Sequence, residues 1–139
     1  MINHGIQEGL VTDFRKTTSP QDASLTSGSM ELTYLVSTPA VINIIIDASS
    51  EMLDKLLPPE YITIGTHLEI SHENPTLVGE AINLRIKVIK VVNNEVLLEF
   101  EGTDSVGLFC RGKYERYIVN KDKLLQSAYA RFPDSQNVQ

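Results

Sequence analysis

The stretch LVSTPAVINIIIDASSEMLDKLL, residues 35–57, is the longest apolar run in the chain, and the rest of the sequence is organised around it. Thr38 is predicted to cap the first free backbone N–H groups of a helix. Pro39 suits the first helical position, where its missing N–H costs nothing. Pro58 and Pro59 cannot continue a helix and should end it. Between these marks the residues make about five turns at 3.6 residues each.

The first half of this helix is apolar nearly all round, which predicts a buried helix. Its β-branched residues would also fit a strand, but the capping signals, the length and the spacing of the apolar residues in 52–57 favour a helix. Asn43 and Asp47 lie four residues apart and therefore on one face. Because buried polar groups need partners, that face either has polar neighbours in the core or lines a site.

Composition limits the classes of protein that the chain can belong to. Its 139 residues predict a single domain over 1–139, and the net charge of −6 argues against a general nucleic-acid binder. The best candidate for a membrane span is interrupted by Asn43, Asp47 and Glu51. Residues 1–5 show no secretory signal, and the single cysteine, Cys110, fits a reducing compartment, so we expect a cytoplasmic protein.

Alternation of apolar and polar residues predicts five strands, over residues 8–17, 62–72, 79–92, 95–104 and 108–119. The second of these is expected to bury one face, made of Ile62, Ile64, Leu68 and Ile70 with His72 at its end.

The segments between the strands carry turn and loop chemistry. Residues 18–30 are predicted to be a loop, Asn93-Asn94 a tight turn and 121–131 a short amphipathic helix. The polar tail from Pro133 is expected to fray. A strand, a long buried helix and four further strands predict an α+β domain in which an antiparallel sheet wraps around the helix.

Motifs for several common chemistries are absent from the sequence. His67 and His72 are five positions apart and so should point to opposite faces of a strand, and no zinc-binding spacing is present, so no metal site is predicted. There is no glycine-rich phosphate loop and no GxSxG nucleophile elbow. Cys110 has no motif around it and is predicted to be a packed thiol.

Two segments carry a resemblance to a known family. TYLVSTPAVI at 33–42 and GTHLEISH at 65–72, followed by Glu115-Arg116, resemble the fluoroacetyl-CoA thioesterase-like branch of the hotdog-fold thioesterases. The resemblance covers roughly residues 9–120. It implies a hotdog fold, a five-stranded antiparallel sheet around one long buried helix. It also implies a homodimer with acyl-thioester sites at the subunit interface and no cofactor beyond the coenzyme A of the substrate.

The resemblance also implies a set of site residues. The family's threonine and histidine fall on Thr38 and His72. Its glycine, whose backbone N–H would hold the thioester oxygen, falls on Gly65, and its late arginine falls on Arg116. With His72 as general base, Thr38 is expected to donate a hydrogen bond or to be the nucleophile.

The helix carboxylate of the family has no direct counterpart. Its position, eight residues after the threonine, is occupied by Ile46. Asp47 follows and is rotated by about 100° around the helix, where it is a candidate substitute. Asn43 lies one turn earlier and is a candidate to orient a water. The hydratases of the superfamily place an aspartate and a histidine five apart, whereas the fifth residue after Asp47 is Met52.

Two functions therefore remain open at the level of sequence. The first is hydrolysis of an acyl-CoA thioester by a His72-centred mechanism at a dimer interface. The second is a non-catalytic hotdog protein that binds acyl-CoA or a small ligand and has lost the helix carboxylate at Ile46. Basic side chains on two strands are candidates to meet the phosphates of coenzyme A, or form a solvated sheet face: Arg85, Lys87, Lys90, Arg111, Lys113 and Arg116.

Overall fold

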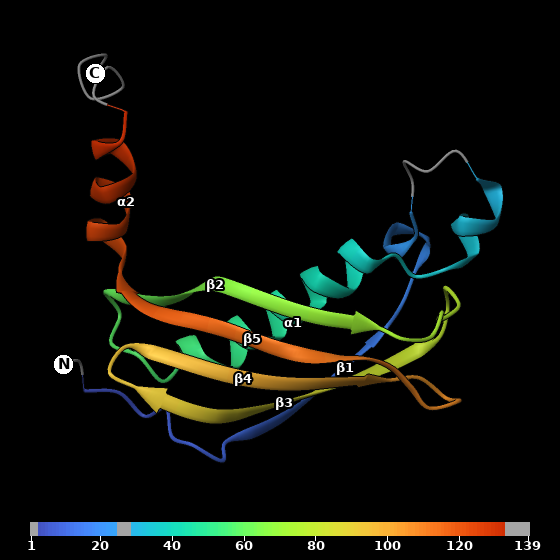
Figure 1. Cartoon of the computed structure of the whole chain (residues 1–139), viewed down its shortest axis with the longest axis horizontal. Coiled ribbons are helices and arrows are strands. Elements are labelled where there is room, and N and C mark those ends of the chain that lie inside the picture. Colours follow the sequence, from blue (N-terminus) through green and yellow to red (C-terminus); the bar gives the residue numbers. More distant parts are fainter. Residues whose placement is uncertain (1–2, 25–28, 133–139) are drawn as a thin grey trace.

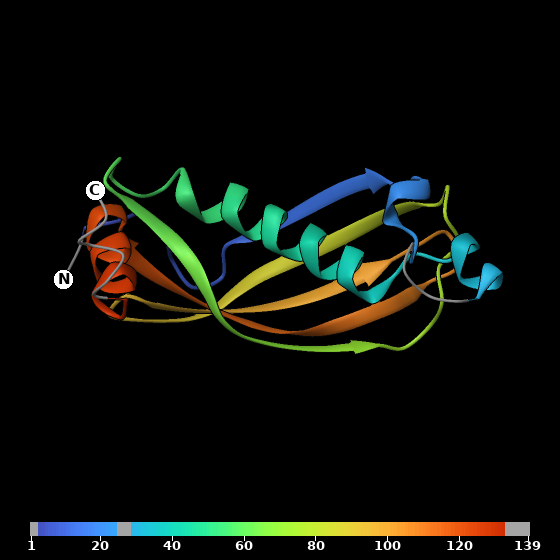
Figure 2. The ribbon, with the colours of Figure 1, turned by 90° about the horizontal axis from the view of Figure 1, so that it is seen from above.

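A computed structural model describes residues 3–24 and 29–132 of the chain. Its five strands form one antiparallel sheet in the order β1-β3-β4-β5-β2, and α1 lies across one face of that sheet (Figures 1 and 2). The strands are β1 (Val11–Thr17), β2 (Tyr61–His72), β3 (Ala81–Val92), β4 (Glu95–Thr103) and β5 (Leu108–Asn120). The helices are α1 (Thr38–Asp54) and α2 (Lys121–Ala130), with short 3-10 turns η1 (Pro20–Asp22) and η2 (Met30–Tyr34).

This architecture confirms the predicted order of elements and the α+β class. The first strand begins three residues later than expected, at Val11, and η1 and η2 occupy parts of the predicted loop. Residues 25–28 of that loop and the predicted frayed tail from Pro133 lie outside the described residues. No helix in the described ranges is long and apolar enough to cross a bilayer.

The core lies between α1 and the inner faces of β3 and β4. Alternation predicted the inner faces of these two strands correctly, because a period of two places every second side chain on the same face. They contribute the buried side chains Ile82, Leu84, Ile86, Val88, Val96, Leu98 and Phe100. From α1, Val41, Ile44, Ile45, Ala48, Met52 and Leu53 pack against them.

α1 is buried along the face that packs on the sheet, as predicted, but not along its opposite face. Asn43, Ile46 and Asp47 are exposed on the face of α1 that points away from the core, and Ile46 is 36% exposed. One sheet covers only one side of a helix, so the opposite face needs another partner or faces solvent.

The N-cap of α1 is Ser37, not Thr38. The Ser37 side chain accepts a hydrogen bond from the Ala40 backbone N–H at 3.1 Å, and its backbone is extended, as in an N-cap residue. Thr38 is already helical, which leaves its hydroxyl free for another contact. Pro39 lies in the first turn as predicted, and the helix ends at Asp54, before Pro58.

The predicted inner face of β2 is correct for only half of the strand. A β-bulge between Gly65 and His67 shifts the register against β5. An extra residue reverses the alternation. Leu68, Ile70 and His72 therefore lie on the inner face as expected. Before the bulge the inner face instead carries Thr63, which is buried, and Ile62 and Ile64 lie on the outer face. His67 and His72 fall on opposite faces, as predicted.

Candidate functional site

The segment that leads into α1 is held by backbone hydrogen bonds on both sides. The Val36 N–H donates to the Thr76 carbonyl at 2.9 Å, and the Ser37 N–H donates to the Asp22 carbonyl at 2.8 Å. Val36 is buried, and Leu35 forms an isolated bridge with Leu77. The position of the first turn of α1 is therefore set by the chain that precedes it and by the connection between β2 and β3.

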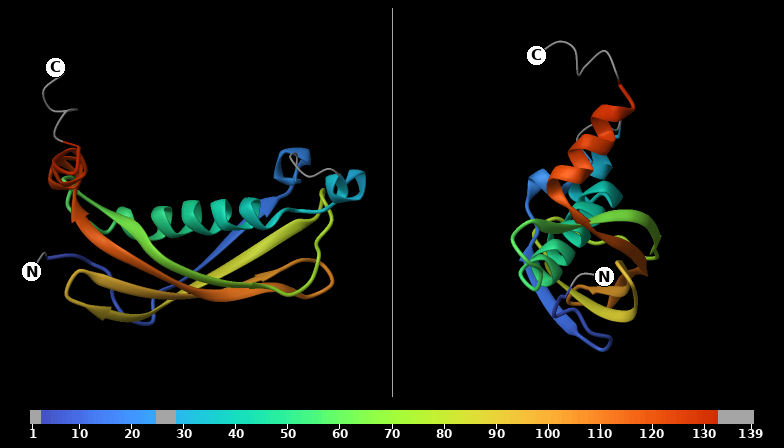
Figure 3. Two further views of the ribbon diagram at one scale, coloured as in Figure 1. Left: turned by 45° about the horizontal axis from the view of Figure 1, so that its top comes forward. Right: turned by 90° about the vertical axis from the view of Figure 1, so that its left-hand side faces the viewer.

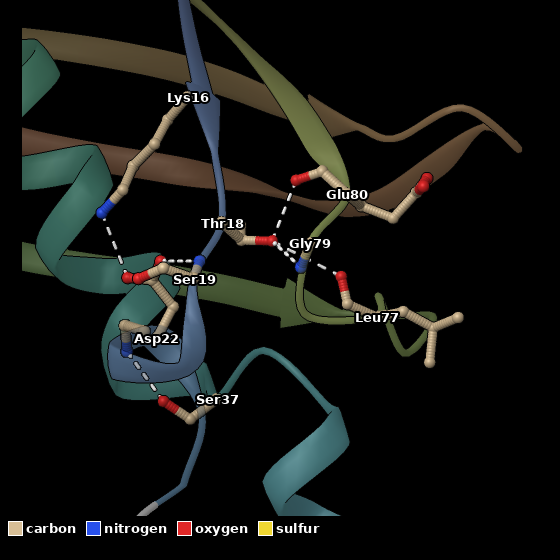
Figure 4. A network of polar contacts seen from close by, with 9 residues as sticks. Lys16, Thr18, Ser19, Asp22, Ser37, Leu77, Gly79 and Glu80 are labelled. Carbon is tan, nitrogen blue, oxygen red and sulfur yellow. Dashed lines mark hydrogen bonds and ion pairs between the residues drawn. The ribbon is translucent and has the colours of Figure 1, made fainter.

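A polar network secures the η1 side of this arrangement (Figure 4). Asp22, only 7% exposed, pairs with Lys16 at 3.1 Å and accepts a hydrogen bond from the Ser19 N–H. The buried Thr18 hydroxyl donates to the Glu80 carbonyl at 2.9 Å and accepts from the Gly79 N–H at 3.0 Å. These contacts join the end of β1 to the turn before β3. The chain next to Ser37 is therefore held by hydrogen bonds and one ion pair.

Thr38 and His72 meet at the N-terminal end of α1. Thr38 Oγ1 lies 2.8 Å from Nδ1 of His72, which is the last residue of β2. Thr38 is exposed, whereas His72 is half-buried and packs edge-on against Phe109, with ring centroids 6.1 Å apart. The structure thus brings together two of the three side chains predicted to be catalytic.

The two nitrogens of His72 are in different surroundings. Nδ1 faces the Thr38 hydroxyl, while Nε2 is buried and has no hydrogen-bond partner among the described residues. In the neutral tautomer with the proton on Nε2, Nδ1 accepts a hydrogen bond from the Thr38 hydroxyl, which is the arrangement of a nucleophile and its base. In the other tautomer, Nδ1 donates to the same oxygen.

A pocket of about 490 Å³ opens beside this pair. Its apolar wall comes from the chain before α1, and its polar wall from the end of β2. It is lined by Ser24, Leu32, Leu35, Val36, Ser37, Thr38, Pro39, His72, Glu73, Asn74 and Pro75. Because the pocket lies at the positive end of the α1 dipole, negative charge that develops there is favoured. Sequence reasoning missed Ser37, Leu32 and the 73–75 turn, although that turn directly follows His72.

The other predicted site residues do not line this pocket. Ile46 lies eight residues along α1 from Thr38, about 12 Å at 1.5 Å per residue, and Asp47 lies one residue further. Gly65 lies seven residues along β2 from His72, on the order of 20 Å at about 3.3 Å per residue. Asn43, Ile46 and Asp47 instead share the exposed face of α1. One chain therefore cannot bring all the predicted residues into a single site.

Arg116 is the centre of a second polar cluster. It is 2% exposed and lies opposite Gly65 in the register of β2 and β5. Its guanidinium donates to the Thr63 hydroxyl at 2.8 Å and to the Thr63 carbonyl at 2.7 Å. It also donates to the Ser50 and Tyr114 hydroxyls, both at 2.9 Å. Protein groups therefore enclose this cation, and a role for Arg116 in substrate binding stays a prediction.

The charge of Arg116 is balanced indirectly. None of the ion pairs among the described residues includes it. The Thr63 hydroxyl, which accepts from Arg116, donates in turn to Asp54 Oδ1 at 2.7 Å. The Thr63 hydroxyl therefore connects the Arg116 guanidinium on β5 to the Asp54 carboxylate at the end of α1 through two hydrogen bonds. We call this connection the Thr63 relay. The Tyr114 hydroxyl, bonded to Arg116, occupies the space where a side chain at Gly65 would begin, which explains the glycine.

Other basic side chains of the predicted phosphate-binding set are paired on the outer face of the sheet. Arg85 forms an ion pair with Asp13 at 3.1 Å, and its hydrogen bonds lower the pKa of that carboxyl. Arg111 pairs with Glu73 at 2.8 Å. These contacts support the interpretation of a solvated sheet face. Lys87, Lys90 and Lys113 are exposed.

Neither the cysteine nor the acidic and histidine side chains of the described residues form a second reactive centre. Cys110 is buried, and desolvation raises the pKa of its thiol to about 11, which agrees with a packed, unreactive side chain. Within residues 3–24 and 29–132, no three His, Cys, Asp or Glu side chains are grouped so that they would hold a metal ion.

Comparison with known proteins gives one matching family and several solved structures with a similar fold. A family model described as fluoroacetyl-CoA-specific thioesterase, FlK, matches residues 19–122. A hot-dog-like protein from Thermanaerovibrio acidaminovorans is 27% identical, with a TM-score of 0.83, over 90% of this chain and 92% of that one. The fluoroacetyl-CoA thioesterase FlK is 17% identical, with a TM-score of 0.82, over 93% and 99%. A mutant of FlK in complex with acetyl-CoA is 16% identical, with a TM-score of 0.82, over 92% and 100%. No curated protein matches the chain in sequence.

Proposed function

The chain belongs to the fluoroacetyl-CoA-specific thioesterase family, FlK, and from this premise we propose that it hydrolyses an acyl-CoA thioester with His72 as general base. Its fold is the hotdog fold of thioesterases. The observation that carries the proposal is the 2.8 Å contact between Thr38 Oγ1 and His72 Nδ1 at the mouth of a pocket. Coenzyme A enters as part of the substrate, and the reaction uses no resident cofactor. The cytoplasmic location stays a prediction.

The contact between Thr38 and His72 favours a mechanism of two steps, with Thr38 as nucleophile. Thr38 Oγ1 attacks the carbonyl carbon of the thioester, and its proton passes to Nδ1 of His72. The C–S bond then breaks, and the coenzyme A sulfur leaves with that proton. A water molecule attacks the acyl-threonine ester, its proton passes to Nδ1, and release of the carboxylic acid regenerates the Thr38 hydroxyl. In the other version, water attacks the thioester directly with His72 as its base, and no acyl-threonine forms.

A homodimer completes the site in this proposal. β2 is an edge strand, and an unpaired edge is a template for pairing with a second copy. Because Gly65 and His72 of one chain lie on the order of 20 Å apart, the Gly65 N–H of the same chain is too far from His72, and we assign the N–H that would hold the oxyanion to the partner's Gly65. Light scattering at micromolar concentration should give about twice the 15.5 kDa of one chain. A stable monomer would contradict the interface site.

Thiol release from a panel of acyl-CoA substrates, beginning with acetyl-CoA, tests hydrolysis. We expect turnover in the wild type and its loss in His72→Ala, since among the described residues His72 is the one base that contacts Thr38. His67→Ala is the matched control, because His67 lies on the same strand, exposed on the other face. Mass spectrometry of the protein during turnover separates the two versions: an acyl group on Thr38 supports the first. Turnover that survives His72→Ala would overturn the assignment.

The apolar side chain at position 46 favours one alternative function, in which the protein binds acyl-CoA without hydrolysing it. An apolar residue stands where the family has its glutamate, and Asp47 does not line the pocket. A binder should retain affinity for acetyl-CoA, measured by calorimetry, with no thiol release from any member of the panel. The two functions therefore differ in one measurement, made on the same protein and ligand.

A further inference from the structure

The pocket beside Thr38 and His72 has an apolar side that takes no part in the bond-breaking steps. Figure 3 shows η1, η2 and the start of α1 gathered at one end of the sheet, where β2 also ends. The apolar side chains that line the pocket come from these segments and from the turn after β2: Leu32, Leu35, Val36, Pro39 and Pro75. Because Thr38 and His72 line the same pocket, an acyl group whose carbonyl carbon lies at Thr38 extends along these side chains.

The described residues offer this pocket no unpaired cation. None of those that line it is a lysine or an arginine, and Glu73 is the one carboxylate among them. Glu73 is already paired with Arg111 at 2.8 Å. Next to Ser37, Asp22 pairs with Lys16 at 3.1 Å (Figure 4). The two cations on the walls around the pocket are therefore each held by a carboxylate of this chain.

The first turn of α1 also has few backbone donors left for an anion. Residue 39 is a proline and has no N–H. The Ser37 N–H donates to the Asp22 carbonyl at 2.8 Å. The Ala40 N–H donates to the Ser37 side chain, and the Val41 N–H to the Ser37 carbonyl, both at 3.1 Å. A helix end binds an anion through such N–H groups, so a carboxylate that enters this pocket loses hydration and gains few partners.

We propose that this pocket selects a neutral, apolar acyl group and discriminates against acyl groups that end in a carboxylate. The apolar side chains stabilise each methylene that they remove from water, whereas a terminal carboxylate finds no cation there. The inference rests on the proposed function for the position of the acyl carbonyl. It concerns binding, however, and does not require hydrolysis.

Two thioethers of coenzyme A test the selection without turnover. S-butyl-CoA ends in a methyl group, and S-(3-carboxypropyl)-CoA has a chain of equal length that ends in a carboxylate. Calorimetry measures the Kd of each for the wild-type protein. We expect S-butyl-CoA to bind at least about tenfold more tightly, because the carboxylate is desolvated without a cation. Equal affinities, or tighter binding of the carboxylate, would overturn the inference.

The natural thioesters give the same comparison during turnover. Butyryl-CoA and succinyl-CoA carry acyl groups of equal length, and the second ends in a carboxylate. A buried methylene contributes about fourfold in affinity. From acetyl-CoA to butyryl-CoA, kcat/KM should therefore rise at least about tenfold, and for succinyl-CoA it should fall below the value for butyryl-CoA by a similar factor. Equal kcat/KM for the three substrates would contradict the selection.

A cation introduced into the apolar side of the pocket should weaken the preference. Leu32 lines the pocket and is 38% exposed, so Leu32→Lys fits the folded chain. We expect this variant to lower the ratio of the two thioether affinities at least about tenfold, because its ammonium group pairs with the carboxylate. Leu77→Lys is the matched control, since Leu77 is 60% exposed and does not line the pocket. It adds the same charge, which attracts the phosphates of both thioethers equally, and should leave the ratio unchanged.

The outcomes separate this inference from the proposed function. An equal change of the ratio in Leu32→Lys and Leu77→Lys would show that the acyl group binds elsewhere, and would overturn the inference. Selective binding of S-butyl-CoA by a protein that releases no thiol from any acyl-CoA would support the inference while refuting hydrolysis. Hydrolysis of succinyl-CoA as fast as butyryl-CoA would overturn the inference and leave hydrolysis intact.

Discussion

Thr38 Oγ1 lies 2.8 Å from His72 Nδ1, which ties the first turn of α1 to the last residue of β2. Ser37 caps the helix, so the Thr38 hydroxyl is not committed to the backbone. A structural and a chemical role are thus divided between neighbouring residues, and the two can be tested separately.

Substitutions of Ser37 and Thr38 should have opposite effects, the first mainly on stability and the second mainly on turnover. Ser37→Ala removes the cap and should lower the free energy of unfolding by about 1 kcal/mol. Thr38→Ala should cost less stability but lose far more thiol release per folded molecule, while Thr38→Ser retains much of it. Urea denaturation and acyl-CoA turnover, measured on the same preparations, check both. Equal turnover in Thr38→Ala and Thr38→Ser would leave the hydroxyl without a chemical role.

Asp47 should not be the acid–base group of the reaction. It is exposed on the outer face of α1, more than 12 Å along the helix axis from Thr38 by the helical rise. Asp47→Asn is therefore expected to change turnover little, whereas loss of an acid–base group costs about 10²-fold or more. A loss of that size in Asp47→Asn would show that the aspartate has taken over the family's carboxylate.

Ile46→Glu introduces a carboxylate at the position where the sequence resemblance implies a glutamate. Because Ile46 is 36% exposed, the charge is tolerated in the folded chain, and turnover should rise if the carboxylate assists hydrolysis. Ile46→Gln has a similar shape without the charge and serves as the control. A rise in both variants would point to polarity instead of charge, and a rise in neither would show that hydrolysis does not use this position.

The Thr63 relay should be important for stability. Thr63→Val removes the hydroxyl that accepts from Arg116 Nε and donates to Asp54, so the buried Nε–H loses its acceptor and Asp54 Oδ1 keeps only the Thr63 backbone N–H as a donor. We expect the free energy of unfolding to fall by about 1–3 kcal/mol. Thr63→Ser keeps the hydroxyl and should lose much less. If Val and Ser variants unfold at the same urea concentration, the relay contributes no stability.

Cys110 should make folding less favourable at high pH. Burial raises the pKa of its thiol from 9.0 to about 11, so the folded chain keeps a proton that the unfolded chain releases first. The contribution of this group to stability is therefore full below pH 9 and falls as the pH rises from 9 toward 11. The stability of Cys110→Ala should fall less steeply across this window in urea denaturation. Parallel curves for the two proteins would contradict the assignment.

Local patterns in the sequence determined much of this molecule. Strict alternation predicted the inner faces of β3 and β4, because side chains on a strand repeat every two residues. The proline pair after α1 and the Asn93-Asn94 turn, where Asn93 adopts φ 54°, are also local signals. The resemblance to the thioesterase family added the pairing of Thr38 with His72, two residues that no local rule connects.

The tertiary structure alone decided the remainder. Ser37 became the cap because pairing of its N–H with the Asp22 carbonyl holds the chain extended until Thr38. The bulge after Gly65 reversed the faces of Ile62 and Ile64, and a single extra residue leaves no mark on an alternating pattern. Arg116 carries the charge of a surface residue, yet it is buried, because Ser50 from α1 and Thr63 from β2 converge on it together with Tyr114 from its own strand. Burial of a cation depends on such convergent partners, and only the folded chain brings them together.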